Sequence, residues 1–155
     1  MNTPFRQELR ESMHGIMDSR DIHSVPYAMA TLKICGQMAP SKPKPEWIHS
    51  TVTPAGRAIS PADAAQCLRD CERTYHFAHG LKDAIKEAQN RFRGEVIRVF
   101  YAGCGPFAPL ALTQTAVFSP DEIKFTALDI HHYSVELARS IAEARMQLLN
   151  PTRHI

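Results

Sequence analysis

Residues 96–129 read VIRVFYAGCGPFAPLALTQTAVFSPDEIKFTALD, the clearest structural pattern in the chain. The pattern predicts a buried strand, a glycine turn, a helix and a second buried strand that ends in an acid. Two strands joined by one helix favour parallel pairing through a crossover connection. At the carboxyl end of such strands, a turn without Cβ atoms lets a ligand approach the backbone, and an acid can accept hydrogen bonds from ribose hydroxyls. The segment therefore predicts a nucleotide-type binding site.

The chain before this segment is predicted to be mostly helical. Apolar residues recur at three- and four-residue steps over residues 4–17 and 25–38, which is typical of amphipathic helices. Residues 39–57 carry four prolines and no period, which predicts a loop or an extended linker. Trp47 and Ile48 lie inside this linker, so we expect the linker to pack against the rest of the protein at one point.

A long helix is predicted to follow the linker. Ser60 provides a hydroxyl cap and Pro61 the first helical position, and an apolar stripe continues for about thirty residues. Because that length is unusual for a globular helix, we expect a bend or a break at Gly80. Gly94 is expected to end the helix.

The predicted fold class is α/β, with N-terminal helices followed by a partial Rossmann-like parallel sheet. Residues 1–93 are expected to form the helical region, and residues 94–155 the first half of a Rossmann-like domain in the order strand, helix, strand, helix. These four elements are expected at residues 96–102, 107–117, 123–129 and 133–149.

Charge and hydropathy argue against several classes of protein. The formal net charge is +2 and the basic residues are scattered, so the sequence gives no electrostatic sign of nucleic-acid or membrane binding. No apolar run approaches the roughly 18 residues that a membrane span requires. The N-terminal residues lack the apolar core of a secretion signal. We therefore expect a cytoplasmic protein whose four cysteines are reduced thiols.

The segment around the glycine turn also resembles class I S-adenosylmethionine-dependent methyltransferases. Residues 99–106, VFYAGCGP, are similar to the first motif of that family, and residues 128–139, LDIHHYSVELAR, are similar to the second. The resemblance implies that the cofactor is S-adenosylmethionine and that residues 94–155 begin a domain that binds it. It implies methyl transfer to an acceptor that the sequence does not identify, by in-line displacement in which the protein supplies mainly proximity and orientation.

The resemblance assigns roles to the residues of these two motifs. It implies that Gly103, Cys104 and Gly105 lie against the methionine part of the cofactor. Asp129 would bind the ribose, and Ile130 would flank the adenine.

Other positions are close to this predicted site or depart from the family pattern. His131 is near enough to Asp129 to contact the edge of the cofactor. Tyr101 is expected at the site, although the family often has at its position an acid that contacts the cofactor's amino group. Phe107 stands where a third glycine is usual, which narrows the loop. No residue for the methyl-transfer step itself is indicated.

Two other functions remain open on the sequence alone. Gly103, Gly105, Ala108 and Asp129 loosely satisfy the dinucleotide fingerprint, so the runner-up is an NAD(P)-binding Rossmann protein. The other alternative is a non-catalytic helical fragment or interaction module.

The sequence disfavours two further chemistries, a metal site and a cysteine nucleophile. Four potential metal ligands fall on one predicted helix, which cannot wrap around an ion, so no metal site is expected: these are Cys67, Cys71, His76 and His79. Cys104 would be a nucleophile only with a base beside it, and the sequence places no histidine there.

The predicted sheet is small. A complete methyltransferase sheet has more strands than the two predicted here, and a two-stranded parallel sheet with open faces is poorly stable alone. We therefore expect either that the chain is the N-terminal part of a longer protein or that a partner chain completes the sheet, and the first is favoured.

Overall fold

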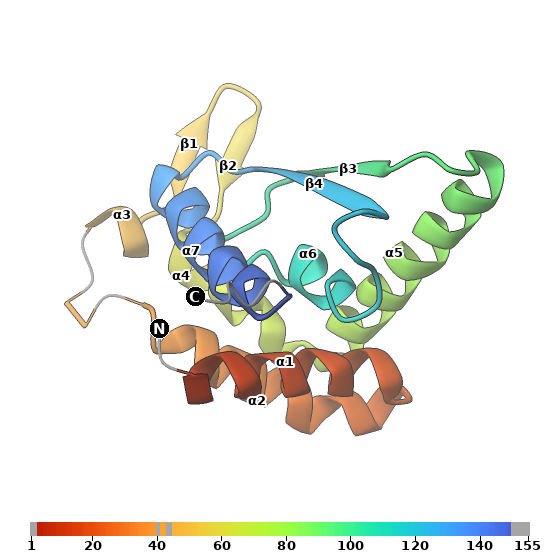
Figure 1. Cartoon of the computed structure of the whole chain (residues 1–155). Coiled ribbons are helices and arrows are strands. Elements are labelled where there is room, and N and C mark those ends of the chain that lie inside the picture. Colours follow the sequence, from red (N-terminus) through yellow and green to blue (C-terminus); the bar gives the residue numbers. More distant parts are fainter. Residues whose placement is uncertain (1–2, 40, 43–44, 150–155) are drawn as a thin grey trace, which may run out of the picture.

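The computed structural model describes residues 3–39, 41–42 and 45–149, and Figure 1 shows how their elements are arranged. The chain is a mixed α/β protein in which helices predominate. In chain order the elements are α1 (Thr3–Asp18), the 3-10 helix η1 (Asp21–Ser24), α2 (Val25–Gly36), α3 (Pro45–Ile48), β1 (Thr51–Thr53), β2 (Gly56–Ala58), α4 (Pro61–Ala65), the 3-10 helix η2 (Gln66–Arg69), α5 (Cys71–Arg91), β3 (Ile97–Ala102), α6 (Pro109–Gln114), β4 (Ile123–Leu128) and α7 (His132–Leu149).

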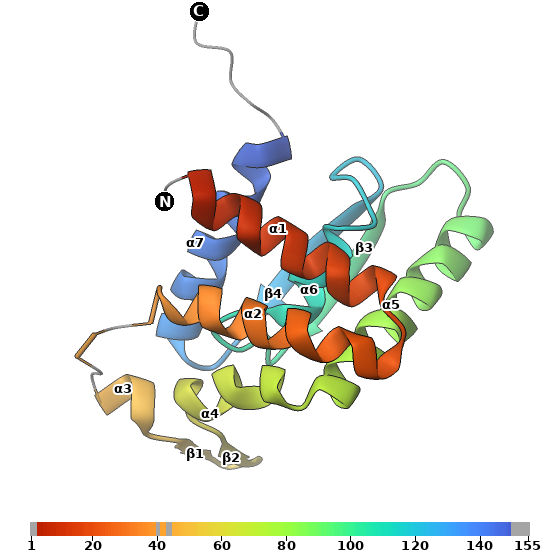
Figure 2. The ribbon, with the colours of Figure 1, turned by 90° about the horizontal axis from the view of Figure 1, so that it is seen from below.

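The strands β3 and β4 form a parallel pair joined by α6, as the sequence predicts. Their register runs from Ile97 opposite Ile123 to Ala102 opposite Leu128, so both strands end at the same edge. Helices α5, α6 and α7 lie on one side of this sheet, and α1 and α2 form a further layer beneath them (Figure 1). Figure 2 shows α1 and α2 side by side across that layer.

One face of the sheet is covered and the other is open, so the expectation of two buried strands is wrong: β3 alternates between half-buried and exposed residues, and β4 buries only Ile123. Ile123 of β4 packs with Ile85 of α5 and Phe118 on the helical side. On the opposite face, the side chains of Phe100 and Leu128 are 66% and 54% exposed, and no element of the described chain covers them. The expectation that both faces would be open is therefore wrong, because the helix that precedes β3 packs against the sheet.

The largest core cluster draws on both ends of the chain. Burying an aliphatic side chain fully contributes about 1.5–3 kcal/mol, so residues from distant segments hold the layers together. The cluster contains Phe5, Leu9, Met13, Ile34, Cys35, Ala65, Leu68, Phe107, Leu112, Leu137 and Ile141. The helical region and the β3–α6–β4–α7 unit thus share one core.

Within the described residues, every helix is too short or too polar to cross a lipid bilayer.

The long helix predicted after Ser60 is interrupted at Asp70. The Ser60 cap is confirmed, since its hydroxyl oxygen accepts a hydrogen bond from the Asp63 N–H at 3.1 Å. Asp70 leaves the helical conformation at φ −79° and ψ 82°, and its carboxylate accepts the Arg73 N–H at 3.1 Å. Because this cap restarts the helix, α5 takes a new direction there. The break predicted at Gly80 is wrong, and Gly80 lies inside continuous α5.

The segment predicted as a linker contains regular structure. Its described part holds the short helix α3 and the antiparallel hairpin β1–β2, which pairs Thr51 with Ala58 and Thr53 with Gly56. Gly56 has φ +135°, which other residues rarely adopt, and so lets the chain reverse. The packing point predicted from Trp47 and Ile48 is confirmed for Trp47, because its ring contacts Tyr133 edge-on with the centroids 5.6 Å apart, whereas Ile48 is 51% exposed.

Candidate functional site

The turn after β3 is built from glycines and fixed to the end of β4. Gly103 and Gly105 have φ +68° and +64°, in the left-handed region that strains residues with a Cβ atom. The N–H groups of Gly103 and Cys104 both donate to the Leu128 carbonyl oxygen, at 2.8 and 3.1 Å. The turn and the acid that follows Leu128 are therefore held in one geometry.

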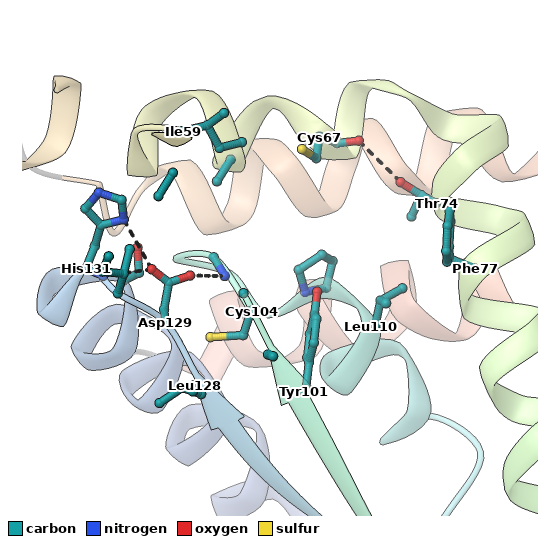
Figure 3. Close-up of a pocket in the computed structure, with 18 of the residues that line it drawn as sticks. Ile59, Cys67, Thr74, Phe77, Tyr101, Cys104, Leu110, Leu128, Asp129 and His131 are labelled. Carbon is teal, nitrogen blue, oxygen red and sulfur yellow. Dashed lines mark hydrogen bonds and ion pairs between the residues drawn. The ribbon is translucent and has the colours of Figure 1, made fainter. Parts of the chain in front are cut away.

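Asp129 lies at the centre of a hydrogen-bond network. Its Oδ2 accepts the Gly105 N–H at 2.9 Å, and its Oδ1 accepts the His131 N–H at 2.9 Å and lies 3.2 Å from His131 Nδ1 (Figure 3). The other ring nitrogen of His131, Nε2, is 3.1 Å from the Thr51 hydroxyl oxygen. A proton on Nδ1 satisfies every member, because Nε2 then accepts from Thr51. Through His131, the hairpin β1–β2 is tied to the acid.

A pocket of about 560 Å³ opens beside this network. One wall comes from the carboxyl ends of β3 and β4 and the glycine turn, and the other comes from the end of β2, α4, η2 and α5. All the residues assigned to the cofactor by the sequence line this pocket. They are Tyr101, Gly103, Cys104, Gly105, Asp129, Ile130 and His131.

A second hollow of about 400 Å³ adjoins the first. The two share Ile130 and His131, and the second is walled by Trp47 and Tyr133, the aromatic pair that anchors the segment containing α3. Glu46 and Glu136 place carboxylates at its rim. The two hollows therefore meet at Ile130 and His131, next to Asp129.

The two titratable residues on the β3 side of the pocket stay neutral at ordinary pH. Burial, with Cys104 as the next cause, raises the pKa of Tyr101 to about 12. Burial, with the Asp129 carboxylate as the next cause, raises the pKa of Cys104 to about 11. A thiol held in this form is a poor nucleophile, which argues against covalent chemistry at Cys104.

The turn offers few donors to an anion. As described above, the N–H groups of Gly103, Cys104 and Gly105 are all engaged by Leu128 or Asp129. The helix α6 begins only at Pro109, which has no N–H, and Ala108 precedes it with φ +42°. No helix N-terminus therefore presents unpaired N–H groups directly after the described glycine turn. A pyrophosphate would find little to bind at this turn.

Four residues of the opposite wall were not indicated by the sequence: Ile59, Cys67, Arg73 and Thr74. Arg73 and Thr74 belong to the first turn of α5, whose direction is set by the cap at Asp70. The single helix predicted over residues 60–93 does not indicate that Arg73 and Thr74 would face the glycine turn. The one available signal is Asp70 itself, an acid three residues before Arg73 and thus a candidate helix cap.

The cysteines and histidines of this region do not gather at one point. Cys67 lines the pocket, whereas Cys71 is buried in a cluster with Ile16. His76 is exposed, 4.0 Å from Asp21, and His79 Nε2 lies 3.2 Å from the Ile16 carbonyl oxygen. These contacts give each residue a structural explanation.

The pocket thus combines a fixed carboxylate, an apolar floor that carries a neutral phenol and a neutral thiol, and a cationic side chain on α5. The chain matches no protein-family model, no curated protein and no solved structure. The donors, acceptors and shape of the pocket therefore carry the information on what it binds.

Proposed function

We propose that the pocket binds S-adenosylmethionine and that the chain belongs to a methyltransferase that transfers the cofactor's methyl group to an acceptor. The observation that carries the proposal is the position of Asp129, held by the Gly105 N–H at 2.9 Å beside a left-handed glycine turn. A carboxylate accepts about four hydrogen bonds, and Asp129 makes three, so Oδ2 keeps an acceptor site for a ribose hydroxyl.

The β3–α6–β4–α7 unit supports the assignment of a Rossmann-like fold. Its parallel strands carry the glycine turn and the acid at adjacent carboxyl ends, the edge at which open α/β sheets bind ligands. We propose that this unit is the first part of a Rossmann-like methyltransferase sheet.

The volume and polarity of the site favour this cofactor over a dinucleotide. About 560 Å³ lies within the 300–1,000 Å³ typical of small-ligand sites. The engaged N–H groups of the turn leave little to bind a pyrophosphate, whereas a sulfonium needs no such donors. Ile130 and the adjoining hollow provide an apolar and aromatic place for the adenine.

The residues of the pocket would act by positioning the reactants. When bound, the cofactor supplies an activated methyl group. Asp129 would fix the ribose, and Cys104, which is 2% exposed, closes the floor of the site against water. Holding two reactants in line removes a large entropic part of the barrier, so this chemistry does not require a protein nucleophile.

Isothermal titration calorimetry with S-adenosylhomocysteine and with NAD tests the proposal. We expect S-adenosylhomocysteine to bind and NAD not to bind. Asp129→Asn removes the charge that the ribose hydroxyls meet, and a hydrogen bond to a charged group contributes about 1.5–3 kcal/mol, so affinity for S-adenosylhomocysteine should fall about 10- to 100-fold.

The matched control is Asp121→Asn, which makes the same charge change at an exposed residue that does not line the pocket. We expect it to leave binding unchanged. Failure of the wild-type protein to bind S-adenosylhomocysteine would overturn the proposal, and binding of NAD alone would favour the dinucleotide alternative.

A further inference from the structure

The end of the pocket farthest from Asp129 has a different character. In Figure 3, His131 and Asp129 lie at one end of the pocket, Thr74 and Phe77 lie at the other, and Tyr101 stands between them. Arg73 also lines the pocket, and its guanidinium carbon is 5.9 Å from the centre of the Phe77 ring. The positive charge of Arg73 is therefore at the Phe77 end.

Arg73 is held by contacts that leave its charge uncompensated. Its Nη1 is 3.6 Å from the Cys67 sulfur, which is a weak acceptor, and the Phe77 ring supplies a cation–π contact. Within the described residues, no carboxylate lies within 4.0 Å of Arg73. Among the described residues that line the pocket, Asp129 is the only acid, and it lies at the other end of the pocket. A guanidinium has five N–H donors arranged as a fork that matches a carboxylate.

Tyr101 adds a second donor near the same place. Its phenol is one O–H donor whose proton can rotate towards an acceptor in the pocket. The phenol oxygen projects into the pocket between η2 and α6 (Figure 3). Arg73 is near enough to act against the rise in the pKa of Tyr101 caused by burial. Tyr101 and Arg73 both line the pocket, so one ligand group there can contact both side chains.

We propose that Arg73 and the Tyr101 hydroxyl form a carboxylate subsite that holds the amino-acid end of the cofactor. This inference rests on the proposed function, and it specifies how the pocket selects its ligand. The ribose diol of the ligand would bind the negative Asp129, and its carboxylate would bind the positive Arg73. One elongated ligand would thus contact both ends of the pocket. A tyrosine at position 101 suits this subsite, because its hydroxyl can donate to the ligand's carboxylate, whereas an acidic side chain at that position would repel it.

Two ligands that differ only in the carboxylate test the subsite by calorimetry. The first is S-adenosylhomocysteine, and the second is its decarboxylated analogue, which keeps the amino group and the thioether. We expect the wild-type protein to prefer the first by about 10- to 100-fold, the effect of a charge-assisted hydrogen bond. Arg73→Ala should weaken the first ligand by a similar factor and leave the second unchanged. Tyr101→Phe should produce a smaller loss in the same direction, about 3- to 10-fold.

The control variant is Arg69→Ala, which removes the same charge from an exposed residue of η2 that does not line the pocket. It should leave both affinities unchanged, and a loss confined to the carboxylate ligand would then belong to the Arg73 position. Unchanged binding of the decarboxylated analogue also shows that Arg73→Ala is folded.

Three results would overturn the subsite while leaving the proposed function standing. They are equal wild-type affinity for the two ligands, equal weakening of both by a folded Arg73→Ala protein, and no effect of that substitution. The comparison in the wild-type protein decides the question even where Arg73→Ala does not fold. Absence of wild-type binding to either ligand would overturn the proposed function, and the subsite with it.

Discussion

The same substitution at two glycines should change stability in opposite directions. Beyond the neighbouring residues and, at Gly80, the backbone of its own helix, an added Cβ atom meets no atom within 4 Å at either Gly80 or Gly103, so packing does not distinguish the two positions. Gly80 lies inside α5, where replacement of glycine by alanine should stabilise the protein by about 0.8–1 kcal/mol. Gly103 has φ +68°, where a Cβ atom costs roughly 1–2 kcal/mol. The variants Gly80→Ala and Gly103→Ala should therefore differ by about 2–3 kcal/mol.

Thermal unfolding followed by circular dichroism measures this difference. For a chain of this size, 1 kcal/mol corresponds to about 2–4 °C, so the two midpoints should lie about 4–12 °C apart, with wild type between them. Equal midpoints, or a Gly103→Ala protein as stable as wild type, would show that the turn does not hold the left-handed backbone. The carboxylate of Asp129 would then lack the fixed N–H partner on which the site depends.

Two further predictions concern the thiols. At pH 8, iodoacetamide should modify partly exposed Cys67 much faster than buried Cys35 and Cys104, and S-adenosylhomocysteine should protect Cys67 because Cys67 lines the pocket. Peptide mass spectrometry would detect both effects. Modification of Cys104 at the same rate as Cys67 would contradict the burial of Cys104. The folded state raises the pKa of Cys104 from 9.0 to about 11, so its contribution to stability is complete below about pH 9 and is lost as the pH rises towards 11. Urea unfolding should therefore show wild-type stability falling over this range more steeply than that of Cys104→Ala, and identical slopes would refute the assignment.

The β3–α6–β4 unit could be predicted from the sequence because its signals are local. Each strand is a short apolar run, and the glycines stand where the backbone needs a left-handed conformation. The neighbourhood of Asp129 followed from those two facts, because parallel strands of matched length end at one edge. Every residue expected at the cofactor lines the pocket for that reason.

The opposite wall of the pocket could not be predicted because its position depends on one change of direction. An apolar stripe continues through residues 60–93, and the spacing alone does not show that Asp70 interrupts it. The glycine penalty at Gly80 is only about 1 kcal/mol, which tertiary packing overrides. Arg73 points at the pocket only because α5 restarts at Asp70.

The hairpin β1–β2 escaped prediction for a different reason. Each strand has only three residues, and none of the six residues is buried, so neither strand carries the apolar pattern that marks a strand in a sequence. Val52 is 81% exposed, so no apolar face signals the pairing. The hairpin is held in place partly from outside, through the contact of Thr51 with His131.

That contact joins positions separated by 80 residues in the chain. Replacing the hydroxyl at position 51 with an apolar group would leave a ring nitrogen of His131, a side chain only 10% exposed, without its partner. Replacing His131 would in turn leave the hydroxyl without one and remove a neighbour of Asp129. The two positions therefore form a single unit under selection. In descendants of this sequence, an accepted change at one should be accompanied by a compensating change at the other.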